Sequence, residues 1–76
     1  MSKLQELRKI NKLSQKDLAN ITNIKIRNII AFENGERDIN GAGLEKLIQL
    51  AIALKCKISD ILEDENLINL CKEIGI

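Results

Sequence analysis

The apolar residues of this chain of 76 residues recur every three or four positions, which is the spacing of one face of an α-helix. At the start of the chain, Leu4, Leu7 and Ile10 follow this spacing and predict a helix from Ser2 to about Asn11. Proline, which interrupts helices, is absent from the sequence. The pattern therefore predicts an all-α protein.

Two short helices with a tight turn between them are predicted next. Ser14 and Asp17 have the spacing of a capping box and begin a helix at about residues 15–21. Asn23 tolerates the left-handed conformation and is expected to form the turn. The second helix, at about residues 25–33, ends before Asn-Gly, a strong helix-stop signal. Two helices joined in this way form a helix-turn-helix unit.

Two more helices are predicted to complete a five-helix domain over residues 1–64. The fourth helix begins near Asn40 and is expected to form the centre of the core, and the fifth spans about residues 58–63. The apolar spacing of the fourth helix places five residues on its inward face: Leu44, Leu47, Ile48, Ala51 and Leu54.

Residues 65–76 are predicted to form an amphipathic helical tail beyond this domain. Its apolar stripe, at positions i, i+3, i+4 and i+7, consists of Leu67, Leu70, Cys71 and Ile74. Asn66 is a plausible N-cap and Gly75 a plausible C-cap of this helix. The stripe can cover its own bundle or meet the tail of a second subunit, so its four residues are also candidates for dimerisation.

The charge of the chain is unevenly distributed, although the net charge is only +1. Residues 1–37 carry eight basic and four acidic side chains, a net charge of +4. Residues 38–76 carry four basic and seven acidic side chains, a net charge of −3. A basic half that contains the helix-turn-helix unit favours docking on a polyanion in one orientation. A mixed, solvated surface is the alternative explanation.

The composition disfavours several classes of function. Histidine and a glycine-rich phosphate loop are absent, and Cys56 and Cys71 match no metal or redox motif. We therefore expect no enzyme, no metal ion or other cofactor, and no small-molecule substrate. No apolar run approaches about 18 residues, and no apolar leader precedes a cleavage site. We accordingly expect neither a membrane span nor a secretory signal, and a cytoplasmic location.

The helix-turn-helix residues resemble those of the Cro/repressor (XRE) family of bacterial and phage DNA-binding domains. The family pattern is matched by Ser14-Gln15-Lys16-Asp17-Leu18-Ala19, Asn23-Ile24-Lys25, Ile29 and Glu33-Asn34-Gly35, and the resemblance continues to about Asp64. It implies a transcriptional regulator, such as a repressor, that binds double-stranded DNA as a homodimer. The chain departs from the family at Lys25, where Ser or Thr usually caps the helix, and at Lys55, where glycine usually ends one.

The resemblance also nominates the residues that would contact DNA. Those expected in the major groove are Lys25, Ile26, Arg27 and Ile30. Those expected near phosphates are Gln15, Lys16, Asn28, Asn34 and Arg37. Arg27 is the best candidate for reading the sequence, because its guanidinium can bond both O6 and N7 of guanine. Gln15 can pair with adenine or a phosphate, or it can simply be solvated.

Ile26 and Ile30 form an apolar strip beside Arg27, at positions where polar side chains commonly read bases. Three interpretations stay open. The strip can contact thymine methyl groups and favour A·T-rich sites, it can dock a protein, or Ile30 can lean back against the first or fourth helix. The second interpretation leads to the alternative function, a degenerate helix-turn-helix that acts as an antitoxin-like or anti-repressor protein-interaction module.

Overall fold

The computed structural model describes residues 2–76, which form short helical segments. The α-helices are α1 (Lys3–Ile10), α2 (Gln15–Thr22), α3 (Ile26–Asn34), α4 (Leu44–Leu54) and α5 (Glu65–Glu73), and single 3-10 turns lie at Ile39–Gly41 and Ile58–Asp60. No strand occurs among the described residues, which confirms the predicted all-α fold. Met1, the first residue of the predicted domain, lies outside the described residues.

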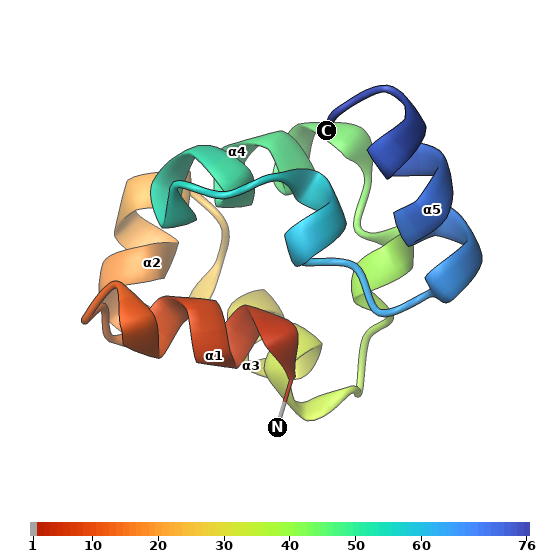
Figure 1. The fold of residues 1–76 in the computed structure, drawn as a ribbon. Helices are drawn as coiled ribbons and strands as arrows, with labels where there is room; N and C mark the ends of the chain where they lie inside the picture. Colours follow the sequence, from red (N-terminus) through yellow and green to blue (C-terminus); the bar gives the residue numbers. More distant parts are fainter. Residues whose placement is uncertain (1) are drawn as a thin grey trace.

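The helices surround one shared core. In Figure 1, α4 lies along the top of the molecule, α1 along the bottom and α2 on the left, with α3 behind α1 and α5 to the right. Most of these elements contribute a side chain that is almost inaccessible to solvent: Leu4, Leu18, Ile29, Leu50, Leu54 and Ile61. Burial of one apolar face from each helix therefore holds α2 and α3, the two helices of the helix-turn-helix unit, against the rest of the bundle.

The predicted capping signals of the helix-turn-helix unit are confirmed. The backbone N–H of Asp17 donates to Ser14 Oγ at 2.9 Å, and the backbone N–H of Ser14 donates to Asp17 Oδ2 at 3.0 Å. Asn23 adopts the left-handed conformation with φ 58°, and Gly35 ends α3 with φ 78°. Lys25 precedes α3 without a side-chain capping bond, as its replacement of Ser or Thr predicted.

The inward face of α4 differs from the prediction. Leu47, Leu50 and Leu54 are buried, whereas Leu44 and Ile48 are 64% and 42% exposed. The helix is apolar on two sides, so spacing alone could not choose between them. Packing against α2 and the turn at Ile58–Asp60 selects the side that contains Leu50, and the other apolar side is left at the surface.

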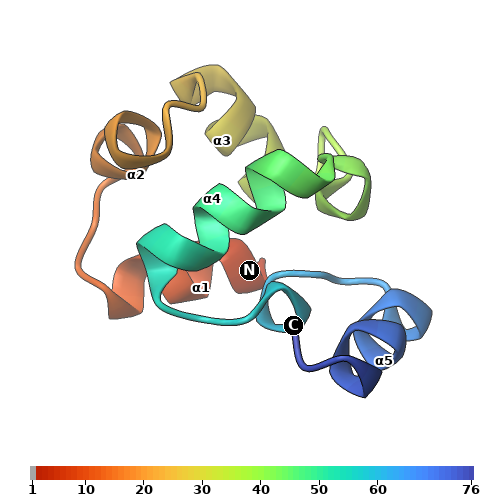
Figure 2. The same ribbon diagram turned by 90° about the horizontal axis from the view of Figure 1, so that it is seen from above.

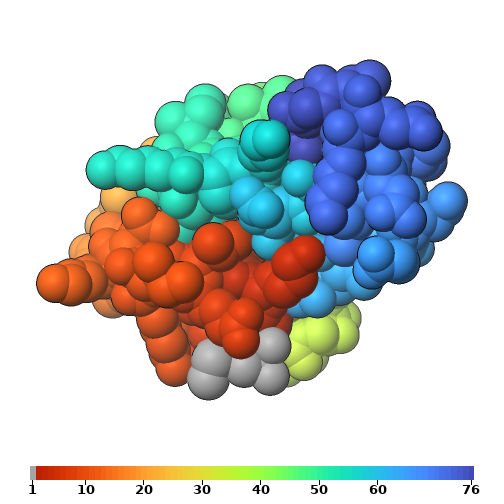
Figure 3. All heavy atoms as spheres, in the orientation of Figure 1, coloured from red at the N-terminus to blue at the C-terminus, as the bar shows by residue number. Residues whose placement is uncertain are grey.

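The fifth helix predicted at residues 58–63 is wrong, because only the 3-10 turn Ile58–Asp60 forms there. The tail instead supplies α5, which begins at Glu65. Its N-cap is Asp64, whose Oδ1 accepts a hydrogen bond from the backbone N–H of Leu67 at 3.1 Å. Asp64 therefore caps the helix in place of Asn66. In Figure 3 the blue tail packs closely against the cyan segment that contains this turn.

The tail covers its own bundle with part of its apolar surface. Ile68 is buried in the core, and Leu67 and Cys71 pack against it. Leu70 and Ile74 are 52% and 73% exposed. α5 contributes to the same core as the other helices, so no break in the packing marks the predicted domain boundary between residues 64 and 65. That boundary stays a prediction.

Candidate nucleic-acid interface

The two long sides of α3 have opposite environments. Ile29 and Phe32 face the core and are 0% and 5% exposed, and their spacing of three residues places them on one side of the helix. Arg27, Ile26 and Ile30 are exposed on the other side. Ile26 and Ile30 are 43% and 36% exposed, so part of the strip beside Arg27 is accessible to a partner.

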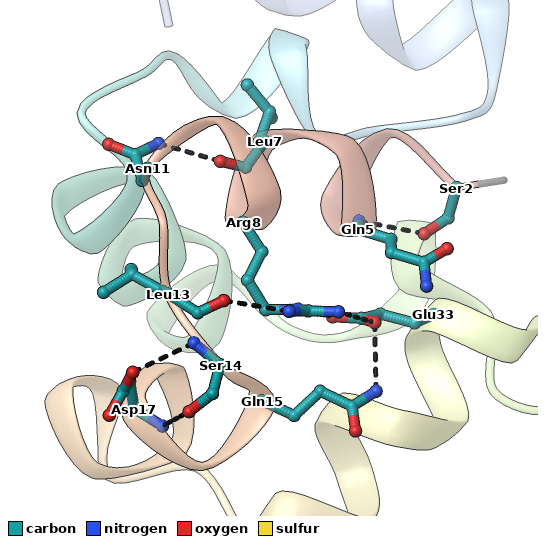
Figure 4. A network of polar contacts seen from close by, with 10 residues as sticks. All are labelled: Ser2, Gln5, Leu7, Arg8, Asn11, Leu13, Ser14, Gln15, Asp17 and Glu33. Carbon is teal, nitrogen blue, oxygen red and sulfur yellow. Dashed lines mark hydrogen bonds and ion pairs between the residues drawn. The ribbon is translucent and has the colours of Figure 1, made fainter.

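A buried ion pair holds the inner side of α3 in place (Figure 4). Arg8 Nε donates to Glu33 Oε2 at 2.7 Å, and Arg8 Nη2 donates to Glu33 Oε1 at 3.1 Å. Arg8 Nη1 also donates to the carbonyl oxygen of Leu13 at 2.9 Å. Arg8 is buried on α1, and its charge is satisfied by a bidentate carboxylate. The hydrogen bond with Glu33 raises the pKa of the Arg8 guanidinium.

Gln15 joins this network, as Figure 4 also shows. Its Nε2 donates to Glu33 Oε1 at 3.1 Å, so the carboxamide points toward the inner end of α3. The bond links the first turn of α2 to the last turn of α3. The phosphate contact expected of Gln15 stays a prediction.

Arg37 is positioned by two contacts with α3. Its Nη1 donates to Asn28 Oδ1 at 3.1 Å, and its guanidinium lies 6.0 Å from the centre of the Phe32 ring, within cation–π range. These contacts hold an exposed cation beside α3. Asn28, predicted near phosphate, therefore acts in the free protein as the acceptor that orients Arg37.

Basic side chains gather around an open hollow beside α3. Of the described residues that line this basic hollow, four are cationic and one, Glu36, is acidic; the cations are Lys25, Arg27, Arg37 and Lys46. Lys46 comes from α4, and the sequence pattern missed it because it belongs to the half of the chain with net negative charge. The position of Lys46 in the sequence does not indicate that it lies near the helix-turn-helix unit, because only the packing of α4 brings it to the basic hollow.

The remaining predicted residues lie on both sides of this hollow. Lys16 and Ile26 line a second hollow between α2 and the start of α3, together with Lys25. Asn34, at the last turn of α3, is exposed. The structure therefore brings the predicted groove residues together on the outward side of α3, with Lys16 and Arg37 at its flanks.

The described residues carry little else that indicates chemistry. They hold no group of three or more His, Cys, Asp or Glu side chains able to bind a metal ion. Burial raises the pKa of the Cys56 thiol, which disfavours the reactive thiolate. Among the described helices, none has the length and apolar character that crossing a bilayer requires.

Comparison with known proteins agrees with this geometry. No characterised protein and no solved structure matches the chain significantly. A family model described as a helix-turn-helix domain matches residues 2–67, which covers most of the chain and includes α1 to α4. Together with the capped α2, the left-handed turn at Asn23 and the exposed outer side of α3, this match shows that the chain belongs to the helix-turn-helix domain family.

Proposed function

We propose that this protein is a sequence-specific DNA-binding transcriptional regulator of the Cro/repressor type, which reads the major groove of double-stranded DNA with α3. The observation that carries the proposal is the division of α3. Its inner side is locked by the buried pair of Arg8 and Glu33, while its outer side presents Arg27 between two exposed isoleucines. A rigid helix with one free side is what groove entry requires.

Each part of the outer surface has a role in this proposal. Arg27 bonds O6 and N7 of a guanine, and Ile26 and Ile30 contact thymine methyl groups on neighbouring pairs. Lys25 lies in the groove at the start of α3, and backbone phosphates are bound by the surrounding residues, namely Gln15, Lys16, Asn28, Asn34 and Arg37, together with Lys46. Phosphate contacts set the register on the duplex, and base contacts set the sequence.

The modest charge of the chain favours a dimeric working unit. A single subunit with a net charge of +1 gains little from counterion release, whereas two subunits that read two half-sites double both the phosphate and the base contacts. We propose a homodimer that acts in the cytoplasm and needs no cofactor.

Selection of binding sites from a pool of random duplexes tests the proposal. We expect enrichment of sites that contain a guanine flanked by A·T pairs, arranged as an inverted repeat. Binding to the enriched site should weaken steeply as salt is raised, because each phosphate contact releases counterions. If no sequence is enriched and no duplex is retarded at low salt, the regulator assignment is wrong.

The exposed strip of Ile26 and Ile30, 43% and 36% exposed, also favours a second candidate function, docking of another protein. Changing both residues to Ser separates the two functions. A regulator should lose its preference for A·T pairs beside the guanine, because the apolar contact with thymine methyl groups is removed. Loss of capture of a partner protein with unchanged DNA binding would instead favour the interaction module.

A further inference from the structure

The backbone at Arg37 is fastened to the end of α3. Gly35 turns the chain out of the helix in the left-handed conformation, with φ 78°. The backbone N–H of Arg37 then donates to the carbonyl oxygen of Ala31 at 3.2 Å, so the chain returns to the last turns of the helix. Arg37 therefore follows α3 in space as well as in sequence.

The loop beyond Arg37 is fastened at its other end. Asp38 Oδ1 accepts hydrogen bonds from the backbone N–H and the side-chain amide of Asn40, at 3.0 and 2.8 Å. Asn40 Oδ1 in turn accepts hydrogen bonds from the backbone N–H groups of Glu63 and Asp64, at 2.9 and 3.0 Å. Hydrogen bonds thus fix the backbone on both sides of Arg37.

The guanidinium of Arg37 is held by two side chains of α3. Its Nη1 donates to Asn28 Oδ1 at 3.1 Å, and its central carbon lies 6.0 Å from the centre of the Phe32 ring. Asn28 and Phe32 are four residues apart, so they are neighbours along one side of the helix. A long side chain that is already held in place loses less conformational entropy when it binds a partner.

We propose that Asn28 and Phe32 clamp Arg37, so that Arg37 and α3 meet DNA as one rigid unit, and that Asn28 is the positioning residue of this Arg37 clamp. The inference rests on the proposed function and deepens it, because Asn28 acts on the phosphate through Arg37. Asn28 directly follows Arg27 in the chain. A phosphate bound by Arg37 therefore sets the register in which Arg27 reaches its guanine.

The clamp lies at the basic hollow. Asn28 and Arg37 line this hollow together with Arg27 and with Lys46 of α4. Figure 2 shows the yellow-green segment that follows α3 next to the green first turns of α4. A guanidinium carries five N–H donors, so one bond to Asn28 is compatible with a charge-assisted contact to a phosphate oxygen. The clamp thus holds its cation on the surface that also presents the base-reading side chain.

NMR relaxation of the arginine Nε–H groups in the free protein tests the clamp without DNA. The chain has three arginines, which form an internal scale, because Arg8 is bound bidentately by a buried carboxylate and Arg27 is exposed. We expect the order of the Arg37 group to be closer to that of Arg8, and Asn28→Ala to make it as mobile as that of Arg27. Asn28→Asp should keep the order, since a carboxylate oxygen also accepts from a guanidinium. A wild-type Arg37 as mobile as Arg27 would overturn the proposal.

A double-mutant cycle tests the same coupling in DNA binding, measured by fluorescence anisotropy on the site enriched by selection. Asn28→Ala should weaken binding about 2–10-fold, because Arg37 must then be ordered on binding. It should also lower the preference for guanine, although the proposal gives Asn28 no base contact. The double variant Asn28→Ala/Arg37→Ala should bind no more weakly than Arg37→Ala. If the two losses multiply, Asn28 acts independently of Arg37 and the clamp is wrong.

Asn34→Ala is the matched control, because Asn34 is an exposed asparagine of the same helix. Its loss of affinity should multiply with that of Arg37→Ala, as expected for residues that act independently. A coupling as large as that of Asn28 would show that any asparagine of α3 affects Arg37, and it would overturn the assignment of Asn28.

Failure of the clamp and failure of the proposed function have different outcomes. A protein that holds Arg37 ordered but binds no duplex would overturn the regulator assignment alone. A protein that binds duplex DNA selectively while its free Arg37 is mobile would overturn the clamp alone.

Discussion

The inner side of α3 is held by contacts with other helices, whereas its outer side faces solvent. On the inner side, the Glu33 carboxylate is 1% exposed and accepts three hydrogen bonds, two from Arg8 and one from Gln15. On the outer side, Arg27 is exposed to solvent. The comparison shows that stability and recognition are assigned to opposite sides of one short helix. Residues on the outer side can therefore change without disturbing the fold.

The largest expected effect comes from the inner side, with Glu33→Gln. The variant leaves the Arg8 guanidinium buried without a counter-charge, so we expect a loss of about 3 kcal/mol in the free energy of unfolding. Chemical denaturation measures it. Glu36→Gln, at an exposed carboxylate just after α3, should change stability by less than about 0.5 kcal/mol. Equal stability of the two variants would show that the buried pair does not hold the helix.

The outer side should show the opposite behaviour in Arg27→Ala. Removal of a bidentate guanine contact should cost about 1–3 kcal/mol of binding free energy for the selected site, with discrimination at that base pair lost. Fluorescence anisotropy measures both quantities, and the melting temperature should not change. Lys72→Ala, which removes an exposed cation from α5, is the control. A similar loss in both variants would mean that Arg27 acts only as a charge.

Lys46→Gln tests whether the proposed DNA face includes α4 as well as the outer side of α3. If Lys46 binds a phosphate, the slope of log affinity against log salt concentration should decrease by about 0.9 in magnitude. The relative preference among sequences should be retained, because phosphate contacts carry no base information. Lys72→Gln should leave the slope unchanged. An unchanged slope in Lys46→Gln would confine the DNA face to α2, α3 and the loop that follows.

The smallest expected effect concerns Asp17, at the start of α2. Hydrogen bonds from the backbone and then the side chain of Ser14 lower the pKa of the Asp17 carboxyl. A lowered folded-state pKa adds stability above the unfolded value of about 3.9, and this contribution is lost as the pH falls through the folded value. We expect Asp17→Asn to weaken the acid dependence of the melting temperature below about pH 4. Glu73→Gln should preserve the wild-type dependence, and a wild-type curve in Asp17→Asn would contradict the prediction.

Local signals predicted the recognition unit well. The cap at Ser14, the left-handed turn at Asn23 and the stop at Gly35 depend on neighbouring residues only, so spacing and residue type were sufficient. The groove candidates Ile26, Arg27 and Ile30 are exposed on α3, and helical spacing alone places them away from Ile29 and Phe32. The burial of Arg8 could not be predicted in the same way, because a cation on a helix normally faces water and the carboxylate partner of Arg8 is 25 residues away in the sequence.

By itself, the sequence determined the existence of α1 to α4, the turn between α2 and α3, and the residues that α3 presents outward, because capping and helical periodicity act over a few residues. Only the tertiary structure decided which apolar side of α4 is buried and that residues 58–63 form one turn. It also decided that Lys46 joins the cations beside α3. Each of these outcomes depends on which elements meet in space, and a periodic pattern with two apolar faces carries no information about that choice.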